Sequence, residues 1–191
     1  MSDNNGRSAL YKLDPGQSRF QVRAFAGGMF SALGHNPTLA IHGFGGEVRF
    51  VREALEASSL QMKIRPDSLS VVNDVSDKDR REMERAMQQE VLEIAKYPAI
   101  SFESSRISGS ASGGDRYQVD ITGNLSLHGV TRSQLVRAYI GLNGERLHAY
   151  GEFTLRQTDF KIKLVSVAGG ALKLKDELKF SFDIVAVRTD Q

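Results

Sequence analysis

The sequence predicts a mainly β protein, a closed or nearly closed antiparallel up-and-down β-barrel of about eight strands with one amphipathic helix packed outside. The first observation is the alternation of apolar and polar residues over Tyr117–Leu127, which gives a strand one apolar and one wetted face. The second is that similar alternation recurs along most of the chain between turn residues. The third is that only Ser76–Ala95 has a helical period. A long antiparallel sheet tends to close, because closure removes its exposed edges.

The chain opens with a polar segment, residues 1–9, which we expect to be a disordered lead. Residues 10–191 then form a single domain that begins with a strand from Leu10 to about Ala26, interrupted near Asp14-Pro15-Gly16. Glycine and proline flank the next segment, which predicts a loop over Met29–Pro37. Short apolar runs predict three further strands, Thr38–His42, Gly46–Val51 and Ser58–Ile64.

The helix predicted over Ser76–Ala95 is rich in strong helix formers and contains neither glycine nor proline. Ser76 followed by Asp79 is similar to a capping box, and Tyr97-Pro98 ends the helix. Apolar residues recur at every fourth position and should face the sheet as one stripe: Met83, Met87, Val91 and Ala95.

The C-terminal half consists of strands joined mainly by hairpins. The predicted strands are Ala99–Ile107, Arg116–Leu127, Gln134–Leu142, Arg146–Arg156 and Lys173–Val187. One hairpin turns through Gly109–Asp115 and another through Asn143-Gly144, a dipeptide suited to a two-residue turn. A barrel of about this many strands is either filled by its own side chains or able to hold one small ligand.

Composition argues against several classes of protein. The formal net charge is +2 with acids and bases interspersed, so the chain offers no basic face for nucleic acid. There is no cysteine, which excludes disulfides, thiolate metal sites and a cysteine nucleophile. The polar start MSDNNGRSAL lacks the apolar core of a secretory signal, and no apolar run is long enough to span a membrane. We therefore expect a cytoplasmic protein without stable membrane insertion.

Few sequence patterns indicate a metal-binding or catalytic site. The four histidines show no metal-binding spacing, and we expect no metal and no cofactor. No GxSxG elbow or supported Ser/His/Asp set is present, so we expect no enzyme. Arg132 and Arg156, near predicted strand ends, are candidates for contact with a phosphate or another polar head group, although an ordinary surface salt bridge is the commoner role for each.

Segments in four places resemble the YceI-like family, whose members adopt a lipocalin-like barrel. They occur in the family order and are YKLDPGQSRFQV (Tyr11–Val22), YPAISFESS (Tyr97–Ser105), GNLSLHGVTR (Gly123–Arg132) and LRQTDFKI (Leu155–Ile162). The chain departs from the family pattern at Gln17, where histidine is frequent, at Ser133, where proline is, and at Lys161, where glycine is.

This resemblance implies non-enzymatic binding or transport of an amphiphilic isoprenoid lipid in the barrel interior, such as a polyprenyl quinone precursor or a polyprenyl phosphate. It also implies a link to the stress response, and family members are often periplasmic. An alternative of a different class stays open, a stress-related structural or protein-interaction module with a packed barrel and no ligand. A homodimer also stays open.

The candidate ligand-binding residues combine apolar strand rows with a loop at the barrel mouth. Burial of a prenyl chain would supply about 0.8 kcal/mol per CH₂ unit, so no charged clamp is required. The apolar candidates are Phe20, Val22, Phe50, Met62, Phe102, Leu125, Phe153, Phe160, Phe180 and Phe182, joined at strand ends by Arg132 and Arg156. In the loop, we predict that Phe30 and Leu33 pack over the opening, with His35 near the polar end of the ligand.

Overall fold

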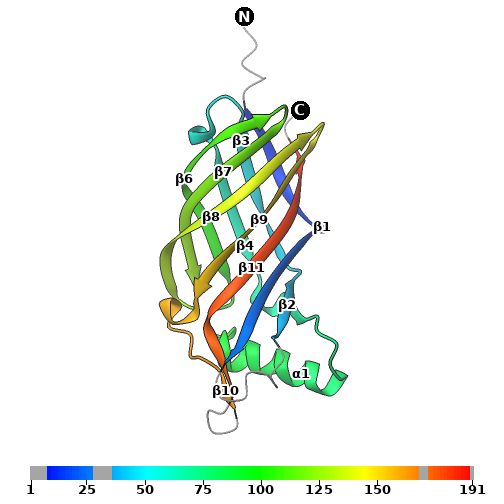
Figure 1. Cartoon of the computed structure of the whole chain (residues 1–191), viewed down its shortest axis with the longest axis vertical. Helices are drawn as coiled ribbons and strands as arrows, with labels where there is room; N and C mark the ends of the chain where they lie inside the picture. The colour runs from blue at the N-terminus through cyan, green and yellow to red at the C-terminus, as the bar shows by residue number, and fades with distance from the viewer. Residues whose placement is uncertain (1–7, 28–35, 168–171, 190–191) are drawn as a thin grey trace, which may run out of the picture.

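The computed structural model describes residues 8–27, 36–167 and 172–189, and in it eight strands close into an antiparallel barrel (Figure 1). Pairing of the last strand with the first completes the wall. The predicted fold class is therefore confirmed. In order around the wall the strands are β1 (Ser8–Gly27), β3 (Phe44–Val51), β4 (Ser59–Ile64), β6 (Ile100–Gly113), β7 (Arg116–Leu127), β8 (Val130–Asn143), β9 (Arg146–Arg156) and β11 (Leu172–Arg188).

Short strands extend the sheet beyond the barrel. β2 (Thr38–Ile41) pairs with β1, β5 (Leu69–Val71) pairs with β2, and β10 (Ser166–Val167) pairs with β11. β5 and β10 were not predicted, because two or three residues are too few to show alternation. At the N-terminus β1 starts earlier than predicted, since Ser8 and Ala9 of the expected lead pair with β3.

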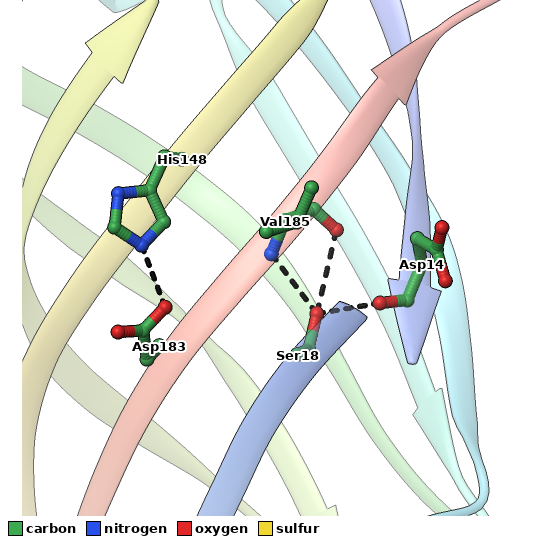
Figure 2. A network of polar contacts seen from close by, with 5 residues as sticks. All are labelled: Asp14, Ser18, His148, Asp183 and Val185. Carbon is green, nitrogen blue, oxygen red and sulfur yellow. Dashed lines mark hydrogen bonds and ion pairs between the residues drawn. The ribbon is translucent and has the colours of Figure 1, made fainter. Parts of the chain in front are cut away.

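The first strand bends where the sequence predicts an interruption, and side-chain hydrogen bonds stabilise this kink. The carboxylate of Asp14 accepts the backbone N–H of Gly16 at 3.0 Å and that of Gln17 at 3.3 Å. The hydroxyl of Ser18 donates to the carbonyl of Asp14 at 2.6 Å and accepts the N–H of Val185 at 2.9 Å (Figure 2). Side chains thus replace the ladder bonds that the kink interrupts, as buried backbone groups require partners.

The kink also changes which residues face inward. Tyr11 and Leu13 are buried before it, whereas Phe20 and Val22 are buried after it. Between Asp14 and Arg19 the chain advances five positions, while its β11 partner advances only two, from Val185 to Asp183. β1 therefore has three more residues than β11 over this stretch. Because three is an odd number, the inward-facing residues of β1 change from odd to even positions.

The helix forms as α1 (Asp77–Ala86), followed by a π-helical turn at Met87–Val91, and lies at the lower end of the barrel beside β5 (Figure 1). Its cap is confirmed, because the hydroxyl of Ser76 accepts the N–H of Asp79 at 3.1 Å. The predicted end at Ala95 is wrong. The chain turns at Glu93, which adopts a positive φ of 45°.

That turn connects the helix to the barrel. The Glu93 carboxylate lies 2.7 Å from Nε2 of the buried His128, whose Nδ1 lies 3.2 Å from the carbonyl oxygen of Phe160. His128 and Gly129 both have positive φ, 52° and 73°, and form the two-residue turn between β7 and β8. His128 is therefore a turn residue.

Candidate binding site inside the barrel

An elongated cavity runs inside the barrel. Its volume is about 1050 Å³, with the part that opens to solvent included. All eight strands of the barrel contribute residues to this channel. The lining residues are Leu13, Phe20, Val48, Phe50, Ser58, Leu60, Met62, Ile64, Phe102, Ile107, Val119, Ile121, Leu125, Gln134, Val136, Ala138, Ile140, Leu147, Ala149, Phe153, Phe182 and Ile184.

The cavity wall is uncharged. Among the described residues that line it, only Ser58 and Gln134 have polar side chains. The hydroxyl of Ser58 accepts the N–H of Val51 at 2.9 Å, and the amide of Gln134 donates to the carbonyls of Leu135 at 2.8 Å and Thr154 at 3.3 Å. These groups are already partnered, and burial of an unpaired charge is costly. The interior can therefore accommodate an apolar chain but not a charged group.

Aromatic rings make up much of the wall. Phe153 stacks on Phe180 with ring centroids 4.7 Å apart and lies 6.4 Å from Phe182. Gly151 leaves room for this group, because a Cβ there would lie 2.8 Å from Cζ of Phe182. Gly123 does the same for Phe102, whose Cζ would lie 2.4 Å from an added Cβ. These two glycines thus leave room for phenylalanine rings that line the cavity.

The barrel end nearest the chain termini is tightly packed. Tyr11 and Leu147 are each only 2% exposed, and Phe50 meets Tyr117 edge to face at 5.0 Å. The 3₁₀ turn Leu55–Ala57 adds the buried Leu55 to the same cluster. The channel is therefore closed at this end.

A second apolar cluster fills the opposite end, near the helix. It contains Phe160 and Ile162, 2% and 4% exposed, with Leu92 from the end of the helical segment packed against it. Leu125 belongs to this cluster and also lines the cavity. The channel therefore stops at this layer within the described residues.

The structure distributes the predicted ligand residues over several environments. Those that line the cavity are Phe20, Phe50, Met62, Phe102, Leu125, Phe153 and Phe182. Val22 belongs to the large core cluster, Phe160 to the layer at the helix end, and Phe180 stacks behind Phe153. Phe30, Leu33 and His35 lie outside the described residues. Direct contact of any of them with a ligand stays a prediction.

The predicted ligand-binding residues are mainly aromatic and omit most of the aliphatic residues that line the cavity. Val119 and Ile121 lie on the same row as Leu125, and Val136, Ala138 and Ile140 form a second row. The alternation itself was the signal for these residues. No sequence pattern identifies Gln134 as a lining residue, because it is polar and its hydrogen bond depends on Thr154 of the neighbouring strand.

The two candidate arginines lie outside the cavity with partners of their own. Arg132 Nε donates to the carbonyl of Asp159 at 2.6 Å, and Arg156 Nε donates to the Asp176 carboxylate at 2.9 Å. The hydrogen bond to Asp176 raises the pKa of Arg156 above its usual value. Contact with a head group would have to compete with these interactions.

The described part of the chain contains neither a metal-binding cluster nor a membrane-spanning helix. No three His, Asp or Glu side chains there gather closely enough to hold a metal ion. None of the helical segments there is both long and apolar enough to cross a membrane.

Known proteins share this fold over nearly the whole chain. A structure of BcnA from Burkholderia cenocepacia superposes with a TM-score of 0.69 at 21% identity and covers 92% of this chain and 99% of its own. A polyisoprenoid binding domain from Saccharophagus degradans gives 0.69 at 15% identity over 94% and 98%. A YCEI protein from Campylobacter jejuni gives 0.60 at 15% identity over 80% and 85%.

Sequence comparison agrees with the structural one. A UPF0312 protein from Pseudomonas savastanoi is 30% identical over 152 residues, which are 73% of this chain and 71% of the relative. One from Azotobacter vinelandii is 32% identical over 126 residues, 63% and 60% of the two chains. The YceI-like domain profile matches residues 11–186, so the chain belongs to the YceI-like family.

Proposed function

We propose that this protein binds the chain of an amphiphilic isoprenoid lipid inside its barrel and carries or stores it without chemical change. The observation that supports this most strongly is the uncharged channel, lined almost entirely by aliphatic and aromatic side chains. The structural neighbour described as a polyisoprenoid binding domain adds support through a shared fold. An isoprenoid chain matches the channel because it is long, thin and apolar along its whole length.

The channel constrains the head group of the ligand. Because no charged side chain lines it among the described residues, a phosphate head would have to remain outside while the chain is buried. A polyprenyl quinone precursor has a neutral ring that can follow its chain further into the channel. Both ligand classes remain in the proposal, and they differ in the depth at which the head lies.

The alternative of a fully packed interaction module is less well supported. A packed barrel would interdigitate its apolar rows and leave few voids larger than a water molecule. Here the same rows surround a continuous cavity. A non-enzymatic role is part of the proposal, since the described residues of the cavity lining include no titratable side chain that could transfer a proton.

Native mass spectrometry of the purified protein with added geranylgeraniol, together with lipid extraction, tests this function. We expect one isoprenoid per chain and loss of binding in Ala149→Phe, because Ala149 lines the channel and a phenyl ring there would fill it. Ala111→Phe, at an exposed strand position, is the matched control and should bind as the wild type does. Absence of both co-purified and added isoprenoid would overturn the proposal.

A further inference from the structure

We infer that the apolar chain reaches the interior sideways, through a seam between β8 and β9, and that the apolar rim of this seam rests on the lipid surface that supplies the chain. The rim consists of Leu135, Tyr139 and Tyr150. This inference rests on the proposed lipid-binding function and adds to it a route and a partner, the surface of a lipid bilayer.

The seam is a gap in backbone pairing. The β8–β9 ladder runs from the Asn143–Arg146 pair to the Tyr139–Tyr150 pair and stops there, although β8 extends back to Val130 and β9 onward to Arg156. On their other sides, β8 pairs with β7 along residues 130–141 and β9 pairs with β11 along residues 146–156. The barrel wall therefore lacks backbone pairing between β8 and β9 over about half their length.

One side chain bridges the seam. At its start the strands are still close, because a Cβ on Gly151 would lie 2.4 Å from the carbonyl oxygen of Arg137. Farther along, the Gln134 amide reaches across to the carbonyl of Thr154 at 3.3 Å. This hydrogen bond is exposed, yet Gln134 also lines the cavity. Gln134 thus connects the channel lining with the exposed outer side of the wall at the seam.

Both ends of the barrel are less accessible within the described residues. The termini end is filled by side chains such as Tyr11 and Leu147, and the helix end by Phe160 and Ile162. Passage through either end would separate a packed apolar cluster. Passage through the seam would break the exposed Gln134–Thr154 hydrogen bond, which contributes about 1 kcal/mol, and no paired rung of the β8–β9 ladder.

Large exposed apolar side chains gather at this seam. Five such side chains are exposed in the described part of the chain, and three of them lie on β8 and β9: Leu135 at 49%, Tyr139 at 43% and Tyr150 at 48%. Tyr139 and Tyr150 stack at 5.4 Å on the last paired rung, where the seam begins. Tyrosine favours the membrane–water interface because it has an apolar ring and a polar tip.

Continuity with the channel points to a lipid surface as the partner. The rim lies on the outer face of the wall where the β8–β9 pairing ends, and the inner face there is largely apolar, so a chain leaving a bilayer through the seam would remain in contact with apolar groups. Two ion pairs near the rim combine opposite charges, Arg137 with Asp120 at 2.8 Å and Lys179 with Glu152 at 2.8 Å. A rim of three side chains without a net charge suits transient contact with a zwitterionic surface.

Transfer of geranylgeraniol from phosphatidylcholine vesicles tests the rim. We expect Leu135→Ser with Tyr139→Ser to load about tenfold more slowly than the wild type, because each loses apolar contact with the bilayer. Loading from detergent micelles should reach the same final amount. Leu164→Ser with Val72→Ser removes apolar side chains of similar exposure, 41% and 45%, and is the matched control. Equal loading rates of rim and control variants from vesicles would overturn the inference.

A crosslink across the seam tests the route. Because the chain has no native cysteine, only the introduced thiols can react. Leu135→Cys and Thr154→Cys lie opposite each other when the Tyr139–Tyr150 register is continued by four residues. A short reducible thiol crosslinker there should slow vesicle loading about tenfold, and reduction should restore it. The control crosslink, Asn124→Cys with Ser133→Cys on the continuous β7–β8 ladder, should have no effect.

The outcomes separate this inference from the function on which it rests. If the wild type takes up no geranylgeraniol from micelles or vesicles, the proposed function fails and the route fails with it. If the wild type loads from both but the seam crosslink leaves vesicle loading unchanged, lipid binding stands and the lateral route is wrong.

Discussion

At the scale of single residues, the protein separates an uncharged interior from an outer wall of paired charges. Asp176 shows how such a pair is built. Its carboxylate accepts the N–H of Thr158 at 2.9 Å, the hydroxyl of Thr158 at 2.7 Å and Nε of Arg156 at 2.9 Å. Desolvation opposes ionisation of this carboxyl, but the hydrogen bonds from Thr158 and Arg156 outweigh it and lower the pKa of Asp176. The ionised carboxylate holds the turn Gln157–Phe160 against β11.

This arrangement predicts a pH dependence. Because the folded-state pKa of Asp176 lies below its ordinary value of 3.8, the stabilisation is present above pH 3.8 and is lost as the pH falls through the folded-state pKa. Arg156→Gln should move the pKa of Asp176 upward, as followed by NMR of the carboxyl carbon. The control Arg137→Gln should instead raise the pKa of Asp120, its own partner. An unmoved pKa in Arg156→Gln would show that the ion pair is unimportant.

At the scale of elements, two irregular segments hold the regular strands in place. The β1 kink depends on Ser18, whose hydroxyl continues the ladder to β11 (Figure 2). The end of the helical segment depends on Glu93, which reaches the buried His128 in the β7–β8 turn. Each contact joins segments that are distant in sequence, so its loss should be felt by the whole barrel.

Ser18→Ala should lower the free energy of unfolding by about 1–3 kcal/mol, because the N–H of Val185 loses its acceptor. Urea unfolding measures this. Ser110→Ala, at an exposed position in β6, is the control and should change stability by less than about 0.5 kcal/mol. If the two variants unfold alike, water replaces the hydroxyl and the kink does not need it.

Glu93→Ala should be destabilising by about 1–3 kcal/mol, since Nε2 of His128, a residue only 8% exposed, would lose its partner. Hydrogen exchange should show faster opening of the segment around Met87–Val91. Glu90→Ala removes an exposed carboxylate from the same segment and should behave as the wild type. Unchanged exchange in Glu93→Ala would mean that apolar packing alone holds this segment.

These elements also mark how far the sequence could be interpreted. Alternation predicted β7 with its observed bounds, and the Asp14-Pro15-Gly16 signal predicted the kink, because both depend on local preferences. The early end of the helical segment was missed, since it depends on the contact of Glu93 with His128, a distant residue. The seam was missed for the same reason. Apolar and polar residues alternate normally in both strands there. Only the three-dimensional structure shows that β8 and β9 are not paired over this stretch.

At the scale of the whole molecule, the barrel is stable because its apolar rows are buried, yet it keeps a channel between them. Apolar clusters pack at both ends of the barrel. Between them, the apolar side chains that line the channel face empty space on one side and lack packing contacts there. An apolar chain in the channel would supply those missing contacts. Binding should therefore raise stability, because a ligand that binds only the folded state shifts the unfolding equilibrium.

Isothermal titration of the protein with isoprenoid alcohols of increasing length tests the central claim most directly. We expect affinity to rise with each added isoprene unit and then level off once the channel is full, because each buried CH₂ unit contributes about 0.8 kcal/mol. Ala149→Phe should level off at a shorter chain, while Ala111→Phe should follow the wild type. Affinity that does not depend on chain length, or a length limit unchanged in Ala149→Phe, would contradict binding inside the barrel.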